Sequence, residues 1–191
     1  MLTRIKKTTT LSSICISIVL LVSCGGGKEP FPPLPSDEAR FLRIIDSLST
    51  VYDEQPNELK KENIKRLREP LFKQLIPERK VDGWVGWLRD FRVWDGYGVV
   101  EISVGPESGA ILKNSTTTLR VKQGTKLWDQ ISNLEEYARV RFSGRFLSDG
   151  PDDNTYLKIY NPGPYEMSRP EFYFDLISIE TYDENTASTD E

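Results

Sequence analysis

The sequence predicts an α+β protein that is mostly β: a small antiparallel barrel of five to six strands, preceded by one or two amphipathic helices and carrying a short helix between its third and fourth strands. Two observations predict this class. Apolar residues recur in steps of three and four before residue 80, as on one face of a helix. After that point apolar and polar residues alternate, and 16 of the 20 aromatic residues, including all four Trp, lie between residues 80 and 182. Both features are typical of strands with one buried face.

Two helices are expected in a helical N-terminal extension, residues 36–79. Ser36 and Asp37 are candidate N-caps of the first helix, whose apolar face runs over residues 41–52. The second has an apolar face over residues 59–75, and Pro70 should break or kink it because proline disfavours helical geometry in the preceding residue.

The strands of the barrel, residues 80–182, begin with a long alternating run at 81–93. Its length and its glycines predict a bent, bulged strand. Asp95-Gly96-Tyr97-Gly98 predicts a turn into a second strand at 100–104. A weaker strand or strand pair is expected between Ala110 and Val121.

A short helix at 126–134 follows, with Thr125 as its cap. Alternation then predicts strands at 140–146 and 172–176, with a short alternating run at 155–160 between them. Three strands, a short helix and two more strands is the order of the five-stranded OB barrel.

Three segments carry a resemblance to known proteins: Asp82-Gly83-Trp84-Val85-Gly86, Ser143-Gly144-Arg145-Phe146 and Arg169-Pro170-Glu171-Phe172. Together they resemble small exported bacterial proteins with an OB-like barrel, which are largely uncharacterised. These motifs consist of turn, bulge and core residues, so the resemblance implies a fold rather than a chemistry. Another small antiparallel barrel or a β-sandwich is the alternative.

The N-terminus has the pattern of a targeting segment. Arg4, Lys6 and Lys7 precede an apolar run, Leu11–Val22, that is shorter than the roughly 18 residues a membrane-spanning helix needs. Leu21-Val22-Ser23-Cys24 then resembles the lipobox of bacterial lipoproteins. The alternative is a plain secretory signal peptide with a chance cysteine.

The lipobox resemblance implies that residues 1–23 are removed and that Cys24 is acylated, so that the chain is anchored in the lipid bilayer. Gly25 is not the Asp that retains lipoproteins at the inner membrane in the best-known sorting system, which favours the outer membrane of the cell envelope. Residues 24–35 form a Gly/Pro-rich tether. The acidic tail, residues 183–191, is expected to be disordered.

Composition limits the function. The chain has no His, and its second and last cysteine is Cys24, so triads, Cys–His pairs and imidazole-dependent zinc sites are excluded. After cleavage the chain would contain 22 basic and 29 acidic residues. This net negative charge argues against nucleic acid as a general partner. Asp149, Asp152, Asp153 and Asn154 lack the spacing of an EF-hand. We expect no cofactor, no metal and no enzymatic activity. A carboxylate-dependent hydrolase would draw on Asp82, Asp90, Asp95 and Glu101.

OB folds bind ligands on the face of strands two and three, framed by two loops. On this sequence, the predicted loops place Trp94 and Tyr97 on one side and Tyr156, Tyr160, Tyr165 and Arg169 on the other. These rings could stack on sugars or bases, or could pack the barrel ends. The sequence therefore predicts a non-enzymatic envelope lipoprotein that binds or scaffolds a protein or an envelope glycan. The alternatives are an oligonucleotide or oligosaccharide binder and the hydrolase.

Overall fold

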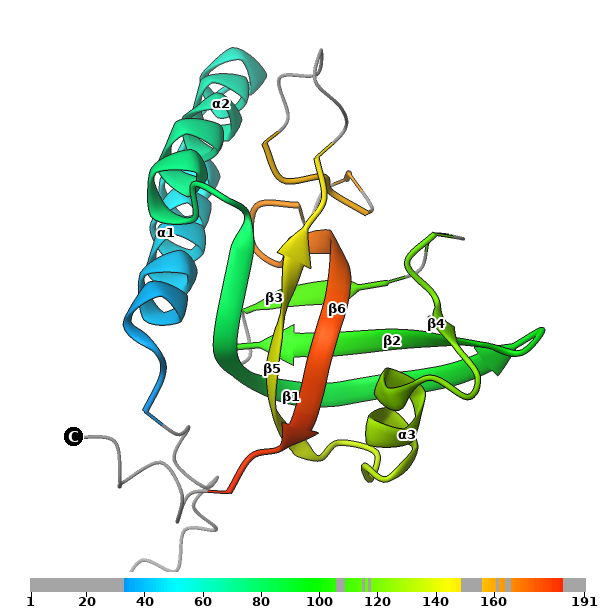
Figure 1. The fold of residues 1–191 in the computed structure, drawn as a ribbon. Coiled ribbons are helices and arrows are strands. Elements are labelled where there is room, and N and C mark those ends of the chain that lie inside the picture. The colour runs from blue at the N-terminus through cyan, green and yellow to red at the C-terminus, as the bar shows by residue number, and fades with distance from the viewer. Residues whose placement is uncertain are drawn as a thin grey trace, which may run out of the picture. The chain divides into compact units, whose positions relative to one another are not determined.

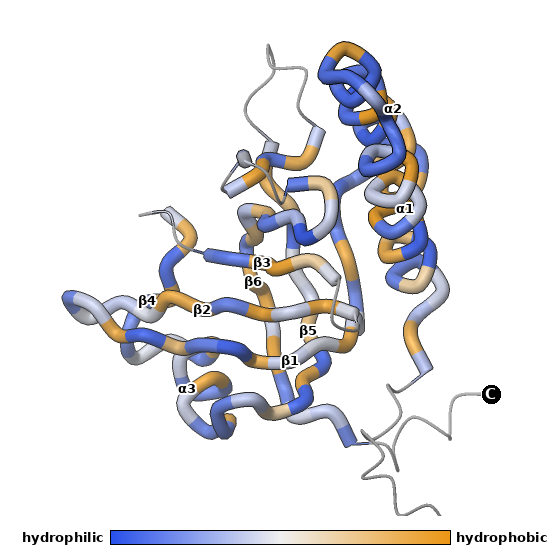
Figure 2. The backbone as a smooth tube through the Cα atoms, turned by 180° about the vertical axis from the view of Figure 1, so that it is seen from behind, coloured by the Kyte–Doolittle hydropathy of each residue, from blue (hydrophilic) through white to orange (hydrophobic). Residues whose placement is uncertain are grey.

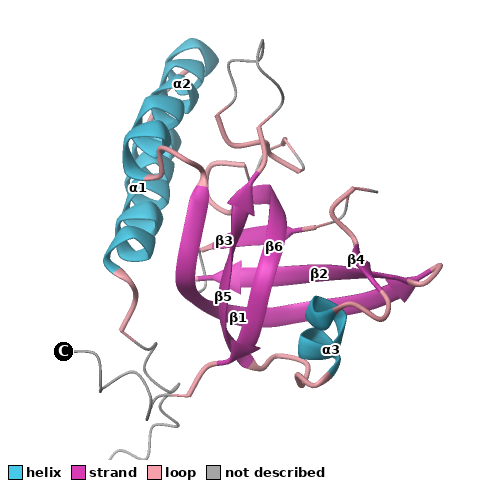
Figure 3. Ribbon diagram, viewed as in Figure 1, coloured by secondary structure: helices cyan, strands magenta, loops and turns pink. Residues whose placement is uncertain are grey.

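The computed structural model describes residues 33–105, 109–114, 116, 118–148, 156–160, 162–163 and 166–183. Within them lie three helices: α1 (Ser36–Asp53), α2 (Glu58–Leu75) and α3 (Lys126–Ser132). The six strands are β1 (Lys80–Trp94), β2 (Tyr97–Val104), β3 (Ala110–Lys113), β4 (Val121–Lys122), β5 (Arg139–Phe146) and β6 (Glu171–Thr181). The class is α+β and mostly β (Figures 1 and 3).

Several sequence predictions concern other parts of the chain. The signal peptide, Cys24 and most of the tether fall in residues 1–32, and all of the tail except Asp183 falls in 184–191, so both lie outside the described residues. No helix in the described ranges is long and apolar enough to cross a membrane.

Five of the strands pair in a ring, and β4 adds two residues beside β2. β1 pairs with β2 and β5, β2 with β3, β3 with β6, and β6 with β5. The β3–β6 pair is parallel, so the prediction of a wholly antiparallel arrangement is wrong there. Strand directions cannot alternate all the way around a ring with an odd number of members. One neighbouring pair must therefore run in the same direction.

β1 is shared between two partners along its length. Its Lys80–Trp87 part pairs with β5, and its Gly86–Trp94 part pairs with β2. The register shifts between Val81 and Trp84 and again between Leu88 and Asp90, which confirms the predicted bulged strand. The parallel β3–β6 pair makes the sheet mixed, and the register shifts of β1 make it irregular, so it is not a clean barrel.

The connections around these strands agree in part with the sequence. Asp95 and Gly96 both have positive φ, 53° and 75°, which is the two-residue hairpin turn typical of Asp-Gly. Thr125 caps α3 as predicted, its hydroxyl accepting the amide hydrogen of Trp128 at 3.3 Å. The alternating run at 155–160 forms no named strand in its described part. It makes a single bridge, Ile159 to Phe172.

The helices correct two predictions. Pro35 occupies the N-cap of α1 without a side-chain cap, and the Asp37 carboxylate instead accepts a hydrogen bond from Trp84 Nε1 at 2.8 Å. α2 continues through Pro70 without breaking. Proline removes the hydrogen bond that the carbonyl of Arg66 would accept. Both residues are exposed, so water can hydrate that carbonyl and the helix tolerates the loss.

The two long helices share their core with the sheet. Figure 1 shows α1 and α2 side by side next to the start of β1. The buried ring of Phe41 on α1 stacks on Phe72 of α2 at 4.9 Å and contacts Trp84 at 5.1 Å and Phe172 at 5.8 Å, measured between ring centroids. Ile131 of α3 belongs to the same cluster. The predicted apolar face of α1 lies in this core through Phe41 and Ile45. The prediction for α2 is wrong in part: Leu59, Leu67 and Leu71 are exposed, and Phe72 is the buried apolar residue of that helix because its side of the helix packs on α1 and the sheet.

A buried carboxylate ties α1 to β1. Oε2 of Glu38 accepts the backbone N–H of Val85 at 2.8 Å, near the part of β1 that extends beyond its pairing with β2. The Glu38 side chain is fully buried, and its other oxygen has no hydrogen-bond partner among the described residues. Burial raises the pKa of Glu38 from 4.5 to about 8, although the Val85 bond acts in the opposite direction.

Candidate ligand-binding face

Side chains of opposite charge lie across the outer surface of four neighbouring strands. Alternation turns Asp90 and Arg92 of β1, Glu101 of β2, Lys113 of β3 and Glu171 of β6 away from the core, while Val100, Ile102 and Leu112 point into it. Figure 2 shows hydrophilic and hydrophobic positions alternating along β1 and β2. We call the five outward residues the charged face.

The charged face is held together by a continuous ion-pair network. Arg92 contacts Asp90 at 2.5 Å and Glu101 at 2.9 Å. Lys113 contacts Glu101 at 3.4 Å and Glu171 at 3.0 Å. The side chain of Lys113 is only 12% exposed and that of Glu101 only 17%. Partly desolvated, multiply bonded pairs of this kind hold their geometry better than exposed single pairs do.

A cleft of about 430 Å³ opens beside this network. It is lined by Arg89, Glu101, Ile111, Lys113, Arg169 and Glu171. Glu101, Lys113 and Glu171 already pair with one another or with Arg92. No hydrogen bond or ion pair joins Arg89 or Arg169 to another of the described residues. The cleft therefore contains two guanidinium groups that are not engaged by the part of the chain that the structure describes.

Tyr160 borders the cleft. Its backbone N–H donates to the carbonyl of Glu171 at 2.7 Å, and Lys113 Nζ lies 4.7 Å from its ring centroid. The ring is 39% exposed and meets Tyr173 edge-on at 5.2 Å. Of the predicted residues, Arg169 lines the cleft, and Tyr160 contacts two of its lining residues, Lys113 and Glu171.

Trp94 and Tyr97 lie at the far end of the same sheet surface. They face each other across the β1–β2 hairpin, with Trp94 65% and Tyr97 37% exposed. Arg120 lies over the Trp94 ring at 4.6 Å. Four residues of β2, roughly 13 Å at the strand rise, separate Tyr97 from Glu101. The hairpin rings and the cleft therefore form two ends of one surface.

Of the remaining two predicted residues, Tyr156 does not join this surface. The hydroxyl of Tyr156 donates to the carbonyl of Ile76 at 2.6 Å, and its backbone N–H donates to Glu69, so it fastens the segment before β6 to the end of α2. Burial raises the pKa of the Tyr156 hydroxyl above its ordinary value. Tyr165 lies outside the described residues.

Comparison of the chain with protein-family models, with curated proteins and with solved structures finds no match. The function therefore has to be argued from the site itself.

Three of the four carboxylates considered for hydrolysis already bind other side chains, and the fourth, Asp95, lies in the β1–β2 turn. Asp90 and Glu101 are cross-strand partners, and both bind Arg92. Asp82 accepts a hydrogen bond from Ser143 Oγ at 2.5 Å. Glu38, whose pKa of about 8 would suit a general acid, is sealed in the core. Within the described ranges, no three acidic or cysteine side chains gather as a metal site would require; Asp149 to Asn154 lie outside them.

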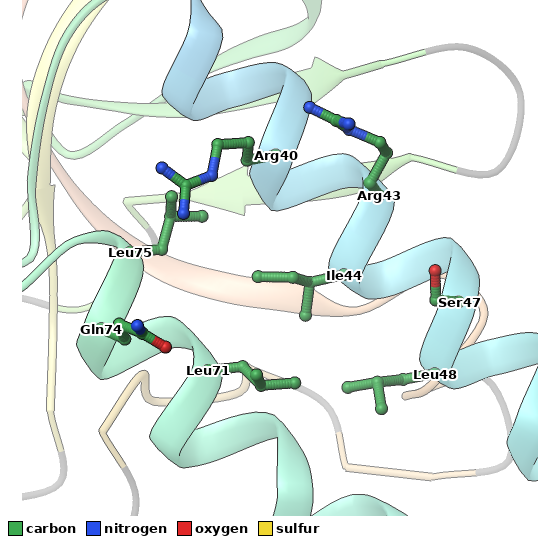
Figure 4. A pocket seen from close by; sticks show the side chains of 8 residues that line it. All are labelled: Arg40, Arg43, Ile44, Ser47, Leu48, Leu71, Gln74 and Leu75. Carbon is green, nitrogen blue, oxygen red and sulfur yellow. The ribbon is translucent and has the colours of Figure 1, made fainter.

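A second concavity, of about 400 Å³, lies between α1 and α2 (Figure 4). Leu48 and Leu71 point toward each other across it, with Ile44 and Leu75 beside them, while Arg40 and Arg43 extend from α1. Four of its eight lining residues are leucine or isoleucine, and the other four are Arg40, Arg43, Ser47 and Gln74, so an apolar floor between the helices has a polar rim.

Sequence reasoning missed Arg89, Lys113 and Glu171 as cleft residues. Alternation alone could have turned Lys113 outward. It could not have placed Glu171 against it, because that contact depends on the parallel pairing of β3 with β6. Arg89 lies in the register shift of β1, where alternation is interrupted.

Proposed function

We propose that this protein is a non-enzymatic binding module of the cell envelope, anchored through an acylated Cys24, which engages an envelope glycan or protein through its charged face and hairpin rings. The observation that carries the proposal is the outer surface of β2 and β3. It holds at one end a cleft with two arginines that form no ion pair with another described residue, and at the other end the exposed rings of Trp94 and Tyr97.

An OB-type fold is part of the proposal. The ring order β1–β2–β3–β6–β5, with α3 between β3 and β5, supports it. In that fold, the face of the second and third strands and the loops beside it are the usual ligand surface, and here these strands are β2 and β3. The carboxylates interspersed on the charged face argue against a nucleic-acid backbone as the ligand.

The binding proposal is tested by recovery of envelope components on the immobilised protein. A Trp94→Ala/Tyr97→Ala variant should recover less of the specific partner than the wild type does, because two exposed rings are lost. A Tyr137→Ala/Ile177→Ala variant is the matched control, since those side chains are 64% and 61% exposed elsewhere. Equal recovery by all three proteins would refute a role for the hairpin.

The anchor is tested separately by cell fractionation. A Cys24→Ser variant should move from the membrane fraction to the soluble fraction, because a chain without acyl groups loses its bilayer attachment. If this variant stayed in the membrane fraction, the lipid anchor would be refuted and the binding proposal would be unaffected.

A further inference from the structure

In the cleft beside the charged face, the carboxylates have ion-pair partners, whereas two of the cations have none among the described residues. Its two carboxylates are each engaged by cations, Glu101 by Arg92 and Lys113, and Glu171 by Lys113. Its remaining cations, Arg89 and Arg169, have no such partner among the described residues. A guanidinium group is a planar set of donors that binds a carboxylate or phosphate in a bidentate manner. The guanidinium groups of Arg89 and Arg169 are therefore suited to bind an oxyanion.

The carboxylates narrow the class of anion. Glu101 and Glu171 line the same cleft as the arginines, so a densely charged polyanion would be repelled by them. Carboxylate oxygens have spare lone pairs even when they form ion pairs, and these can accept hydrogen bonds from ligand hydroxyls. A ligand with one anionic group and several hydroxyls matches both kinds of lining residue.

The size and border of the cleft agree with such a ligand. Its volume of about 430 Å³ lies within the range of small-molecule sites. Tyr160, 39% exposed at its border, offers an aromatic surface against which the apolar side of a sugar ring can pack. Lys113 is fixed by two carboxylates and lies over that ring, so the border is positioned before a ligand arrives.

We propose that the cleft binds an acidic sugar residue of an oligosaccharide, with its carboxylate held by Arg89 and Arg169, its hydroxyls by Glu101 and Glu171, and its ring beside Tyr160. This inference rests on the proposed function, because it names the ligand class of the same surface.

The test is calorimetric titration of the full-length protein with two carboxylated probes, trigalacturonic acid and a hyaluronan tetrasaccharide. Two comparison ligands are titrated in the same way. Fully methyl-esterified trigalacturonate has the sugar rings without the negative charges, and triaspartate has negative charges without sugar rings. We expect at least one of the two carboxylated sugars to bind the protein. The methyl ester and triaspartate should each bind the protein at least about tenfold more weakly than that sugar does.

Variants locate the binding. Arg89→Gln/Arg169→Gln should weaken binding of the acidic sugar about tenfold or more and leave the weak binding of the ester unchanged. Arg43→Gln/Arg66→Gln on the helices alters net charge equally and should bind like the wild type. Thermal unfolding of each variant confirms that the fold is retained.

Three results would overturn the inference. If the protein bound trigalacturonate and its methyl ester with equal affinity, the cleft would not recognise an anion. If it bound triaspartate as tightly as the acidic sugar, the ligand class would be an acidic peptide rather than a sugar. Absence of binding to both carboxylated sugars would remove the ligand class. None of these results affects the recovery experiment with the Trp94→Ala/Tyr97→Ala variant, so failure of the ligand class is distinguishable from failure of the proposed function.

Discussion

Replacing Glu38 by Gln should change how the stability of the protein depends on pH. Because burial raises the pKa of Glu38 from 4.5 to about 8, the folded state holds a proton between these values that the unfolded state has released. The contribution of Glu38 to the stability of the folded protein is therefore fully present below pH 4.5 and is lost as pH rises to about 8. Between pH 5 and pH 8 this amounts to about 3 kcal/mol for a single group with these two pKa values.

The Gln side chain retains an oxygen that can accept the Val85 N–H and has no proton to lose. The amide nitrogen takes the place of the carboxyl oxygen that has no described partner, so the variant should be about as stable as the wild type at pH 5. At pH 8 it should be more stable by about 3 kcal/mol, because the unfolded wild-type chain is stabilised by releasing the Glu38 proton that the folded state retains, and Gln has no such proton.

Equilibrium urea unfolding at pH 5, 6, 7 and 8, followed by tryptophan fluorescence, measures the difference directly. Comparing the two proteins cancels the contributions of other groups, such as Asp175, whose pKa burial also raises. Glu62→Gln on the exposed surface of α2 is the control and should leave the pH profile unchanged. If wild type and Glu38→Gln lost stability in parallel from pH 5 to pH 8, the argument that Glu38 is buried and protonated would be wrong.

Three further predictions concern the packing and the charged face, each measured by urea unfolding. Phe41→Ala should cost about 3–5 kcal/mol, because its ring lies at the centre of the aromatic cluster shared by helices and sheet; a loss below 1 kcal/mol would show that the helices stabilise the sheet little. Lys113→Met should cost about 1–3 kcal/mol even in 1 M salt, because it leaves two partly buried carboxylates without a shared cation, whereas Lys61→Met on the surface of α2 should cost under about 1 kcal/mol. Gly144→Ala should cost about 1–3 kcal/mol, since a Cβ there would meet the backbone carbonyl of Asp175, which cannot move without disturbing the β5–β6 ladder; unchanged stability would contradict that close approach.

Local signals in the sequence were reliable where the relevant interactions are local. The Asp95-Gly96 turn, the cap at Thr125 and the apolar face around Phe41 depend on residues close together in the chain, and each appears in the structure. The helix does not break at Pro70, because a helix that lacks one hydrogen bond at a hydrated carbonyl can continue when tertiary packing holds both of its halves.

The candidate site was predictable only in part. Exposed aromatic rings at the β1–β2 turn follow from alternation and turn chemistry, which is why Trp94 and Tyr97 were found. Tyr156 has the same composition signal but is tied by its hydroxyl to Ile76, and nothing in the neighbouring residues indicates that contact. Arg89 entered the cleft through a bulge that interrupts the alternation.

By itself the sequence determined the class of the protein, the order of its elements and which side of β2, β5 and β6 would be buried, because these depend on periodicity and on turn chemistry. In β1 the register shifts interrupt the alternation, and Trp84 and Leu88 are buried while Val93 is exposed. Only the tertiary structure decided how the strands close on one another. A ring of five requires one parallel pair, and that pair brings Lys113 beside Glu171 although they are far apart in the chain. The same packing buried Glu38 and brought Arg89 and Arg169 into one cleft without an ion-pair partner among the described residues. Burial and charge pairing depend on which distant residues become neighbours, and the alternation within a single strand does not contain that information.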